Sequence, residues 1–509
     1  MKKILLIQPK SPDTFWKLNG AVEITGKKTP IPPLGLLTVA ALTPPKYHVQ
    51  IFDEEVEEID FDAECDLVGI TGYTLHSQRM FEISEKFRER GILTVGGGPY
   101  CSSHPKDSAD HFDVLMCGEG ENIWSQFLAD WEKNDHQKLY KGEEGLDLSS
   151  SPLPRWDLVK LKNYSAAMVQ TSRGCPYDCE FCDIVSLFGR KNRHKPLENV
   201  MREVKLLEQS GCWEIFFGDD NFIGNRKFAK ALLVELIELN KTLKKPLRFI
   251  TQVTLNVAQD VELLDLFKRA NFFSFFIGIE SPKRESLIET NKGHNLNFDM
   301  KEAVEKIQSR GIFIISAMIV GFDSDDIGIF SLHSAFIRET GLTIPFVGIL
   351  MAPKGTKLWS RLEKEGRLLP EAETGDTFNT SNFAPMKMGK KELEDNYMKL
   401  LKEVYSCLHF LKRFQSLIDQ IDLKKVKTDS PLAEQMKLKN FRAFSMGVTF
   451  RLIRHFLFHR DKEMRSFFIS TLKIAFKKGL VCFPLVIELL VYFKAQKEYV
   501  DRLGFNLKR

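Results

Sequence analysis

The stretch that decides the fold is RGCPYDCEFCD, residues 173–183. Its three cysteines, Cys175, Cys179 and Cys182, are separated by three and then by two residues. Iron-sulfur clusters are held by cysteine thiolates, and four of them saturate a [4Fe-4S] cube. Three thiolates leave one iron without a protein ligand. The spacing therefore predicts a [4Fe-4S] cluster whose open iron can bind a small molecule and pass it an electron.

Two alternatives compete with this cluster. A zinc site usually combines paired Cys-x-x-Cys units with a fourth ligand, and the nearest candidate, His194, follows in a basic loop. Three unrelated buried cysteines are the second alternative, which the close spacing within one loop disfavours. The scattered cysteines elsewhere are interpreted as small buried side chains: Cys65, Cys101, Cys117, Cys212, Cys407 and Cys482.

The first third of the chain alternates short apolar runs with helix-length segments. Uniformly apolar strands separated in this way are typical of a parallel sheet that helices cover on both faces. Residues 1–147 are therefore predicted to form a doubly wound, Rossmann-like α/β domain. Its strands are expected at residues 3–9, 48–54, 66–73, 92–99 and 114–121.

Ligands of doubly wound sheets bind beyond the carboxyl ends of the strands. Three of these ends carry glycine, although the G-x-G-x-x-G context of a dinucleotide site is absent. The candidate ligand-binding residues of this domain are Gly72, Tyr73, Thr74, Leu75, Gly96, Gly97, Gly98, Pro99, Gly118, Glu119 and Gly120.

A Pro- and Ser-rich stretch opens residues 148–165, which are interpreted as a linker. A second series of strands with helical segments between them follows over residues 166–385. Six such units are fewer than the eight of a closed barrel, so we expect an open, partial (β/α)6 barrel with its site at the strand carboxyl ends. The strands are expected at residues 166–172, 214–220, 248–255, 272–281, 312–322 and 344–353.

Residues 386–509 have helical periodicity and are predicted to form a mostly helical domain. They carry 26 Lys and Arg against 13 Asp and Glu, whereas the whole chain has a net charge of only +4. Such helices can contact an anionic membrane, and a solvated helical face is the simpler alternative. Zinc-finger, RNA-binding and helix-turn-helix patterns are absent, so we expect no nucleic-acid partner.

The most apolar segment, residues 479–493, is interrupted by Pro484 and Glu488. A membrane-spanning helix needs about 20 apolar residues, so this segment is expected to pack on the barrel or to touch a membrane from one side. The chain begins without a basic and apolar leader, and its nine cysteines show no disulfide framework. We expect a cytoplasmic protein, with peripheral membrane contact as the alternative.

With three cysteines after the first barrel strand, the sequence resembles the radical S-adenosylmethionine enzymes. In those enzymes, S-adenosylmethionine chelates the open iron of the cluster. Three later motifs extend the resemblance: GDD at residues 218–220, GIES at 278–281 and MIVGFD at 318–323. GDD departs from the superfamily's Gly-Gly-Glu but keeps carboxylates for the methionine ammonium. The implied contacts of S-adenosylmethionine are Phe181 on the adenine, Gly218, Asp219 and Asp220 at the ammonium, Glu280 and Ser281 at the ribose, and Ile319 and Gly321 beside the adenine.

A doubly wound domain in front of this barrel resembles the cobalamin-dependent class of these enzymes. The stretches PIPPLGLLTVAAL (30–42), SPLPRWDL (151–158) and IVGFDSD (319–325) resemble more closely the hopanoid C-2 methylases and their relatives, which carry a helical domain after the barrel. The Asp-x-His-x-x-Gly motif, whose histidine ligates cobalt in many such domains, is absent, and His76 and His104 are interpreted as surface residues. The resemblance thus implies base-off cobalamin without a protein histidine on cobalt. A flavodoxin-like domain that binds another nucleotide, or nothing, is the alternative.

The resemblance implies a methyltransferase that uses a [4Fe-4S] cluster, S-adenosylmethionine and cobalamin. A carbon that needs such chemistry lacks acidic hydrogens, which favours a lipid-like substrate of hopanoid or isoprenoid type. The resemblance also implies an external electron donor of flavodoxin or ferredoxin type. Two alternatives are cyclisation or carbon-carbon coupling without methyl transfer, and a nonenzymatic cobalamin or iron-sulfur sensor.

Overall fold

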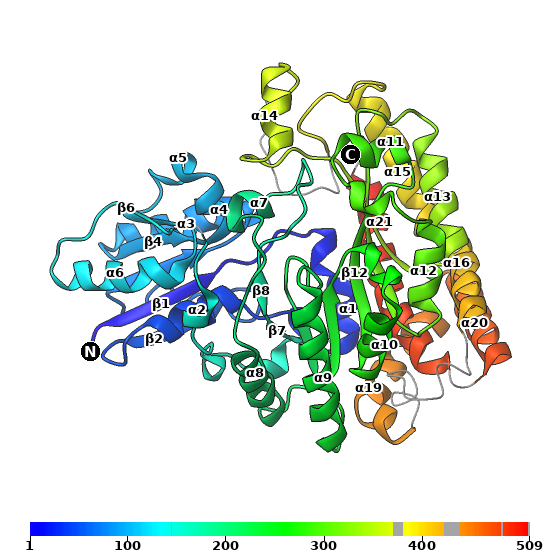
Figure 1. Cartoon of the computed structure of the whole chain (residues 1–509), viewed down its shortest axis with the longest axis horizontal. Coiled ribbons are helices and arrows are strands. Elements are labelled where there is room, and N and C mark those ends of the chain that lie inside the picture. The colour runs from blue at the N-terminus through cyan, green and yellow to red at the C-terminus, as the bar shows by residue number, and fades with distance from the viewer. Residues whose placement is uncertain (144, 370–379, 422–437, 480–481, 507–509) are drawn as a thin grey trace.

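The computed structural model of the chain describes residues 1–143, 145–369, 380–421, 438–479 and 482–506. Two parallel six-stranded sheets are followed by helices of the C-terminal part (Figure 1). This arrangement confirms the predicted fold class.

The first sheet is entirely parallel and has the strand order β2-β1-β3-β4-β5-β6. Its strands are buried because helices cover both faces, as the continuous apolar runs predicted. The three-residue strand β6 was not expected, since only its central residue, Tyr140, is buried. The strands are β1 (Lys3–Gln8), β2 (His48–Asp53), β3 (Leu67–Thr71), β4 (Leu93–Gly97), β5 (Val114–Cys117) and β6 (Leu139–Lys141); the helices include α2 (Leu34–Leu42), α3 (Ser77–Glu89), α4 (Gly98–Ser103) and α6 (Gly120–Glu132).

The second sheet is also parallel and has the order β14-β13-β12-β11-β10-β7. Its two edge strands, β7 and β14, do not pair, so the predicted barrel is open. The strands are β7 (Ala167–Val169), β10 (Glu214–Phe217), β11 (Arg248–Gln252), β12 (Phe272–Glu280), β13 (Phe313–Val320) and β14 (Ile344–Ile349); the covering helices include α8 (Leu197–Gln209), α9 (Arg226–Thr242), α10 (Val261–Arg269), α12 (Met300–Gln308) and α13 (Ile329–Thr340).

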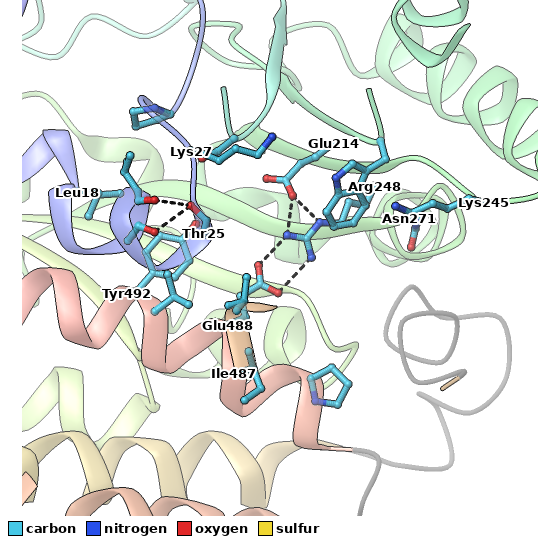
Figure 2. Close-up of a pocket in the computed structure, with 18 of the residues that line it drawn as sticks. Leu18, Thr25, Lys27, Glu214, Lys245, Arg248, Asn271, Ile487, Glu488 and Tyr492 are labelled. Carbon is cyan, nitrogen blue, oxygen red and sulfur yellow. Dashed lines mark hydrogen bonds and ion pairs between the residues drawn. The ribbon is translucent and has the colours of Figure 1, made fainter. Parts of the chain in front are cut away.

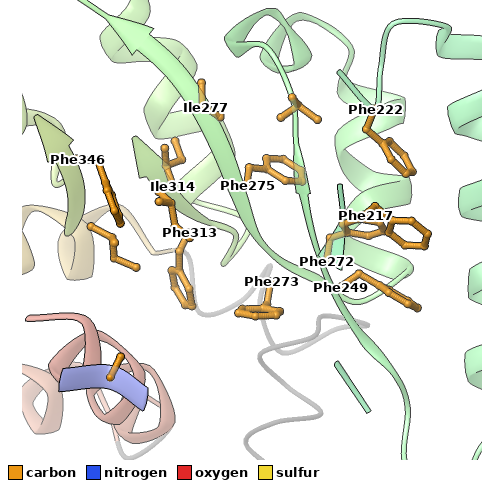
Figure 3. Close-up of a cluster of buried hydrophobic side chains, with 14 of the residues drawn as sticks. Phe217, Phe222, Phe249, Phe272, Phe273, Phe275, Ile277, Phe313, Ile314 and Phe346 are labelled. Atoms are coloured by element: carbon orange, nitrogen blue, oxygen red, sulfur yellow. The ribbon is translucent and has the colours of Figure 1, made fainter. Parts of the chain in front are cut away.

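A cluster of phenylalanines fills the layer between this sheet and its helices (Figure 3). The ring centroids of Phe249 and Phe272 lie 5.2 Å apart, and those of Phe267 and Phe275 lie 4.8 Å apart at nearly right angles. Tilted and edge-on contacts of this kind add to the stability that burial of the rings supplies. The strands that carry the candidate site residues are therefore rigidly packed.

The open side of the barrel is filled from both ends of the chain. Phe15 in a short helical turn (Phe15–Lys17) packs edge-on against Phe346 of β14, with 4.9 Å between the ring centroids. The next helix, α1 (Asn19–Thr25), crosses α21 (Phe483–Asn506) at Gly20, where a Cβ atom would come within 2.9 Å of the Ala495 backbone. Residues 15–25 thus lie against the barrel and the last helix, although the sequence pattern placed them within the first domain.

The C-terminal helices pack on α13 and on the edge of β14. Tyr405 donates a hydrogen bond to the Pro345 carbonyl at 2.8 Å, and Tyr397 donates one to the Val347 carbonyl at 2.9 Å. Within the described ranges, none of the helices is long and apolar enough to span a bilayer. These helices are α15 (Lys390–Val404), α16 (Cys407–Gln420), α19 (Leu438–Leu457), α20 (Lys462–Lys478) and α21.

Candidate active site

The three cysteines lie in the loop between β8 (Ser172–Arg173) and α7 (Ile184–Phe188). Cys175, Cys179 and Cys182 are half-buried, and each is close enough to its neighbour in sequence for their charges to interact. Burial raises the pKa of all three thiols, that of Cys182 to about 12. Binding of iron must therefore displace their protons, which couples metal affinity to pH.

Within the described part of the chain, no three His, Cys, Asp or Glu side chains converge tightly enough to hold a single metal ion. A [4Fe-4S] cube binds each thiolate through a different iron, so its ligands stand farther apart than those of one ion. Three half-buried thiols around one loop fit a cube with an open iron.

The first turn of this loop depends on Gly174. Its φ is +89°, and a Cβ atom there would come within 2.4 Å of the Lys191 carbonyl. The Gly174 amide donates to Asp220 at 2.8 Å, and its carbonyl accepts from Asn192 at 2.8 Å. The glycine before the first cysteine is thus required by its left-handed backbone and by the close approach of the neighbouring chain.

Ion pairs with α14 (Lys357–Lys364) fix the middle of the cysteine loop. Arg361 binds Glu180 at 2.7 Å and also Asp323, in the motif after β13, at 2.9 Å. Lys357 binds Asp178 at 2.5 Å. These pairs hold the segment around Cys179 against the carboxyl end of the barrel.

The two carboxylates of the GDD motif have different surroundings. Asp219 is fully buried and accepts hydrogen bonds from the Thr171 amide and hydroxyl, both at 2.6 Å, and from the Ser172 amide at 2.8 Å. Burial raises its pKa to about 7, while these donors oppose the rise. Asp220 is partly exposed beside the cysteine loop, and burial raises its pKa to about 6. Asp219 therefore joins β10 to the start of the loop, which leaves Asp220 as the better placed carboxylate for a ligand.

A buried ion pair lies at the end of β12. Glu280, with a φ of +64°, binds Lys292 at 2.5 Å, and Gly278 leaves the space for it, since a Cβ atom there would come within 2.2 Å of the Glu280 carboxylate. Although burial opposes the change, the charge of Glu280 raises the pKa of Lys292. Lys292 also interacts with the charge of Cys179 and was not singled out from the sequence, because no motif marks it.

The remaining barrel candidates lie close to one another. Phe181 and Ile319 pack against the same small apolar cluster around Phe322, and the Phe181 and Phe322 ring centroids are 6.3 Å apart. Gly321 has a φ of +101°, and Ser281 is fully buried at the end of β12. The structure thus brings Phe181 of the cysteine loop next to the MIVGFD strand.

The carboxyl edge of the first sheet faces this loop, and α4 lies against α7 (Figure 1). Tyr73, two residues after the end of β3, is 58% exposed. Burial and the charges of Asp183 and Asp220 raise its pKa. Tyr73 therefore lies close to carboxylates of the barrel domain. The candidates that remain at least partly exposed at this edge are Tyr73, Thr74, Leu75, Gly97, Gly98, Pro99, Gly118 and Gly120, whereas Gly72, Gly96 and Glu119 are buried.

Close packing requires the glycines of this edge. At Gly98, with a φ of +85°, a Cβ atom would come within 2.0 Å of the Thr71 hydroxyl. At Gly72 it would come within 2.7 Å of the His76 side chain, and at Gly96 within 2.6 Å of Phe112. The ends of β3 and β4 therefore have no room for larger side chains at these positions.

Neither histidine of this edge is poised as a metal ligand. The His76 ring accepts from the Tyr73 amide at 3.0 Å and lies 3.0 Å from the Ser11 hydroxyl, so both ring nitrogens are occupied. Burial lowers its pKa to about 4. His104 is buried, stacks on Tyr100 and bonds Ser103 at 2.8 Å. Both histidines are structural and buried, where the sequence suggested surface positions.

Buried ion pairs tie the first sheet to the cysteine loop. Glu119, after β5, binds Arg173 and Arg193, both at 2.7 Å, and Arg173 also binds Glu121 at 2.6 Å. Arg173 stands two residues before Cys175, and Arg193 lies on β9 (Arg193–His194), which pairs with β8. Glu119 thus positions the loop from the opposite domain. Neither arginine was expected from the sequence, because the pairs join residues more than 50 positions apart.

Residues 169–328 match the family described as the Radical SAM superfamily, and residues 356–501 match a domain of unknown function, DUF4070. The chain is 34% identical over 445 residues to an uncharacterized methyltransferase of Synechocystis, which covers 86% of this chain and 82% of that protein. It is 33% identical over 376 residues to the hopanoid C-2 methylase of Rhodopseudomonas palustris, covering 72% of this chain and 71% of that protein.

Two solved structures share the fold. The radical S-adenosylmethionine methyltransferase TsrM from Kitasatospora setae has a TM-score of 0.59 at 19% identity and covers 78% of this chain and 82% of its own. The cobalamin-dependent S-adenosylmethionine radical enzyme OxsB has a TM-score of 0.61 at 15% identity and covers 99% of this chain and 80% of its own.

The sheets, the cysteine loop and these similarities define a radical S-adenosylmethionine enzyme. Within that superfamily the chain belongs to the cobalamin-dependent methyltransferases related to hopanoid C-2 methylase. The predicted cofactors of this class are confirmed as a [4Fe-4S] cluster, S-adenosylmethionine and cobalamin.

Replacement of one loop cysteine should remove the cluster without unfolding the protein. We expect Cys179→Ala to lose iron, sulfide and all 5′-deoxyadenosine formation after anaerobic reconstitution, and to keep cobalamin. Cys65→Ala, outside the loop, is the matched control and should retain iron, sulfide and 5′-deoxyadenosine formation. Iron and sulfide analysis with chromatography of 5′-deoxyadenosine measures both variants. A Cys179→Ala protein that still cleaves S-adenosylmethionine would contradict the assignment.

Loss of the pairs between the domains should destabilise the protein. Because Glu119→Gln leaves two buried guanidinium groups short of a negative charge, we expect the free energy of unfolding to fall by about 3 kcal/mol in urea titrations. Glu64→Gln, which removes an exposed partner of Lys3, is the control and should change it little. Equal effects of the two substitutions would show that Glu119 does not hold the domains together.

Proposed function

We propose that this enzyme transfers a methyl group to an unactivated carbon of an apolar, lipid-like substrate of hopanoid or isoprenoid type. The observation that carries the proposal is a row of partly exposed apolar residues on one face of the barrel strands, which we call the lumen. The lumen-facing residues of neighbouring strands remain partly exposed, whereas residues next to them on the same strands, such as Val169, Phe217 and Ile277, are fully buried against helices. The partly exposed lumen residues are Met168, Phe216, Ile250, Phe276, Ala317 and Ile319.

The strand register places these side chains in one wall. Phe216 pairs with Met168 on one side and with Ile250 on the other, and Ala317 pairs with Phe346 of β14. Paired residues of parallel strands share a face of the sheet. The wall therefore runs from β7 to β14, with the partly exposed Gln252 of β11 beside Phe276 of β12.

The first domain closes the open side of this lumen. Trp16 stacks on Phe346 with 4.9 Å between the ring centroids, and its ring lies 6.0 Å from that of Phe276. Trp16 is nevertheless 40% exposed. It extends the apolar wall from the side that has no strand.

Charges stand only at the two ends of the described lumen strands. Glu280 and Lys292 pair near the cysteine loop, and Arg248 pairs with Glu214 at the amino ends of the strands. A substrate between these pairs would meet apolar side chains that exclude water and offer no ionic partner. This environment favours a hydrocarbon skeleton over a charged or peptide-like substrate.

When bound, the cluster, S-adenosylmethionine and cobalamin supply the radical and the methyl group. The chain positions them: Cys175, Cys179 and Cys182 would hold the cluster, and Asp220 would receive the methionine ammonium. Glu280 and Ser281 would contact the ribose, Gly218 and Asp219 would shape the methionine side, and Phe181, Ile319 and Gly321 would flank the adenine. The edge of β3, β4 and β5 would carry cobalamin, and His76 would not serve as its ligand because both ring nitrogens already have partners.

The names of the relatives support a substrate of this kind. The hopanoid C-2 methylase aligns with 72% of this chain. Two further relatives, at 26% identity, are bacteriochlorophyllide d methyltransferases of Chlorobaculum tepidum.

The decisive experiment is anaerobic reconstitution with iron, sulfide and hydroxocobalamin, followed by turnover with an apolar lipid extract. We expect products heavier by one methylene group, together with 5′-deoxyadenosine and S-adenosylhomocysteine. A flavodoxin or ferredoxin would serve as the electron donor. Cleavage of S-adenosylmethionine without methylated product would support cyclisation or coupling, and no cleavage at all would support a sensor.

A substitution in the lumen should weaken substrate binding selectively. Because burying one phenylalanine contributes about 1.5–3 kcal/mol, Phe276→Ser should raise KM for the apolar substrate by about tenfold or more. Formation of 5′-deoxyadenosine without substrate should be unchanged. Ile288→Ser, at a 57% exposed site on α11 (Arg284–Glu289), is the control. An unchanged KM in Phe276→Ser would count against a substrate in the lumen.

We also propose that the substrate reaches the enzyme from an anionic membrane that α19 contacts. Met446, Phe450 and Phe458 are 65%, 67% and 80% exposed. Met446, Phe450 and Arg454 follow one another at intervals of four residues and share one face of α19, and Phe458 comes directly after the last residue of this helix, Leu457. Exposed aromatic side chains interleaved with arginine are typical of helices that lie in the membrane interface.

Membrane contact predicts a loss of vesicle binding when these rings are removed. The double variant Phe450→Ser/Phe458→Ser should co-sediment with phosphatidylglycerol vesicles about tenfold less than the parent. Val234→Ser, at a 46% exposed site on α9, should bind like the parent. Equal binding of the parent to phosphatidylglycerol and to phosphatidylcholine vesicles would argue against an anionic surface.

A further inference from the structure

A second cavity lies at the end of the barrel opposite the cysteine loop. It has a volume of about 220 Å³ and is bounded by α1, α21 and the amino ends of β10 and β11 (Figure 2). The lumen assigned to the substrate and the residues proposed to contact S-adenosylmethionine lie toward the other end of the strands. The apolar wall of the second cavity includes Val22, Trp213, Pro246, Ile487 and Val491.

The charges at the floor of this cavity are satisfied within the protein. Arg248 binds Glu214 at 2.6 Å and Glu488 of α21 at 3.2 Å, and its guanidinium lies over the Trp213 ring (Figure 2). Both carboxylates are therefore engaged by the arginine. With Lys27 and Lys245, the cavity lining carries three cations against these two carboxylates, a net charge of +1.

Two lysines line the same cavity without such partners. Lys27 donates to the Lys162 carbonyl at 2.9 Å, and the Lys245 ammonium lies 4.2 Å from the centre of the Trp213 ring. Within the described part of the chain, neither lysine forms an ion pair. Burial lowers the pKa of both ammonium groups, although the charge of Glu214 opposes this change. An anionic ligand in the cavity would give both lysines an ion-pair partner.

A buried acceptor without a donor lies beside Lys245. Asn271 is 8% exposed, and its side-chain amide donates to the Leu247 carbonyl at 2.6 Å. Because a carbonyl can only accept, this bond fixes the orientation of the amide, and its Oδ1 atom has no partner. A buried acceptor of this kind favours a ligand that brings a hydroxyl group.

We propose that this cavity binds a single-chain anionic lipid. The acyl chain would lie between α1 and α21, the negative charge of the head group would face Lys27 and Lys245, and a hydroxyl of the head group would donate to Asn271. The site is distinct from the substrate lumen and does not depend on the proposed methylation. Since Arg248 and Glu488 join α21 to the barrel at its floor, an occupant would also strengthen the contact between the last helix and the barrel.

The test is calorimetric titration of the full-length reconstituted protein with lysophosphatidylglycerol below its micelle concentration. We expect one molecule to bind per chain. Lysophosphatidylcholine, whose choline cation meets two lysines, should bind about tenfold more weakly than lysophosphatidylglycerol. Glycerol 3-phosphate, which has no acyl chain, should bind no more tightly than lysophosphatidylcholine. Tight binding of glycerol 3-phosphate would replace the lipid by a free phosphate ligand and overturn the proposal.

Two variants locate the site. Lys27→Met/Lys245→Met should lower affinity for lysophosphatidylglycerol about tenfold and leave that for lysophosphatidylcholine unchanged. Lys244→Met, exposed beside Lys245 but outside the cavity lining, is the matched control. Val22→Trp should fill the cavity and abolish binding of both lipids. Undiminished binding by the double lysine variant would overturn the proposal, whether or not Val22→Trp folds. Cys179→Ala, which changes only the cluster loop, should bind lysophosphatidylglycerol like the parent.

Discussion

The buried ion pairs of Glu119 with Arg173 and Arg193 hold the carboxyl edges of two parallel sheets against each other. A charge removed from water needs a partner, and here each partner stands on the other domain. Arg173 directly precedes the cysteine loop, so the same contact that joins the domains also orients the loop. The proposed cobalamin edge, which includes Tyr73, faces the cysteines for this reason.

The open barrel gives the enzyme its lumen. Its edge strands β7 and β14 do not pair, and the gap between them is filled by residues 15–25 and by α21, from opposite ends of the sequence. Trp16 therefore completes an apolar wall that the strands begin. At the other end of the strands, the ion pairs of Arg248 with Glu214 and Glu488 form the floor of the second cavity.

Local patterns predicted the elements well because their causes are local. Every expected strand is present, since runs of apolar residues bury both faces of a parallel sheet wherever helices cover it. The spacing of Cys175, Cys179 and Cys182 identified the cluster loop, because one short loop must bring the three thiols together. Strand β6 was not predicted, because only Tyr140 of its three residues is buried.

The sequence by itself determined the two sheets, the cysteine loop and the glycine-bearing strand ends, because each depends on residues close together in the chain. Only the tertiary structure decided which polar groups meet: that Asp219 serves the loop while Asp220 faces outward, that Lys292 pairs with Glu280, and that Glu488 reaches Arg248 across 240 positions. Such pairs obey no periodicity along the chain. Their energy comes from mutual desolvation, which exists only after the elements have packed.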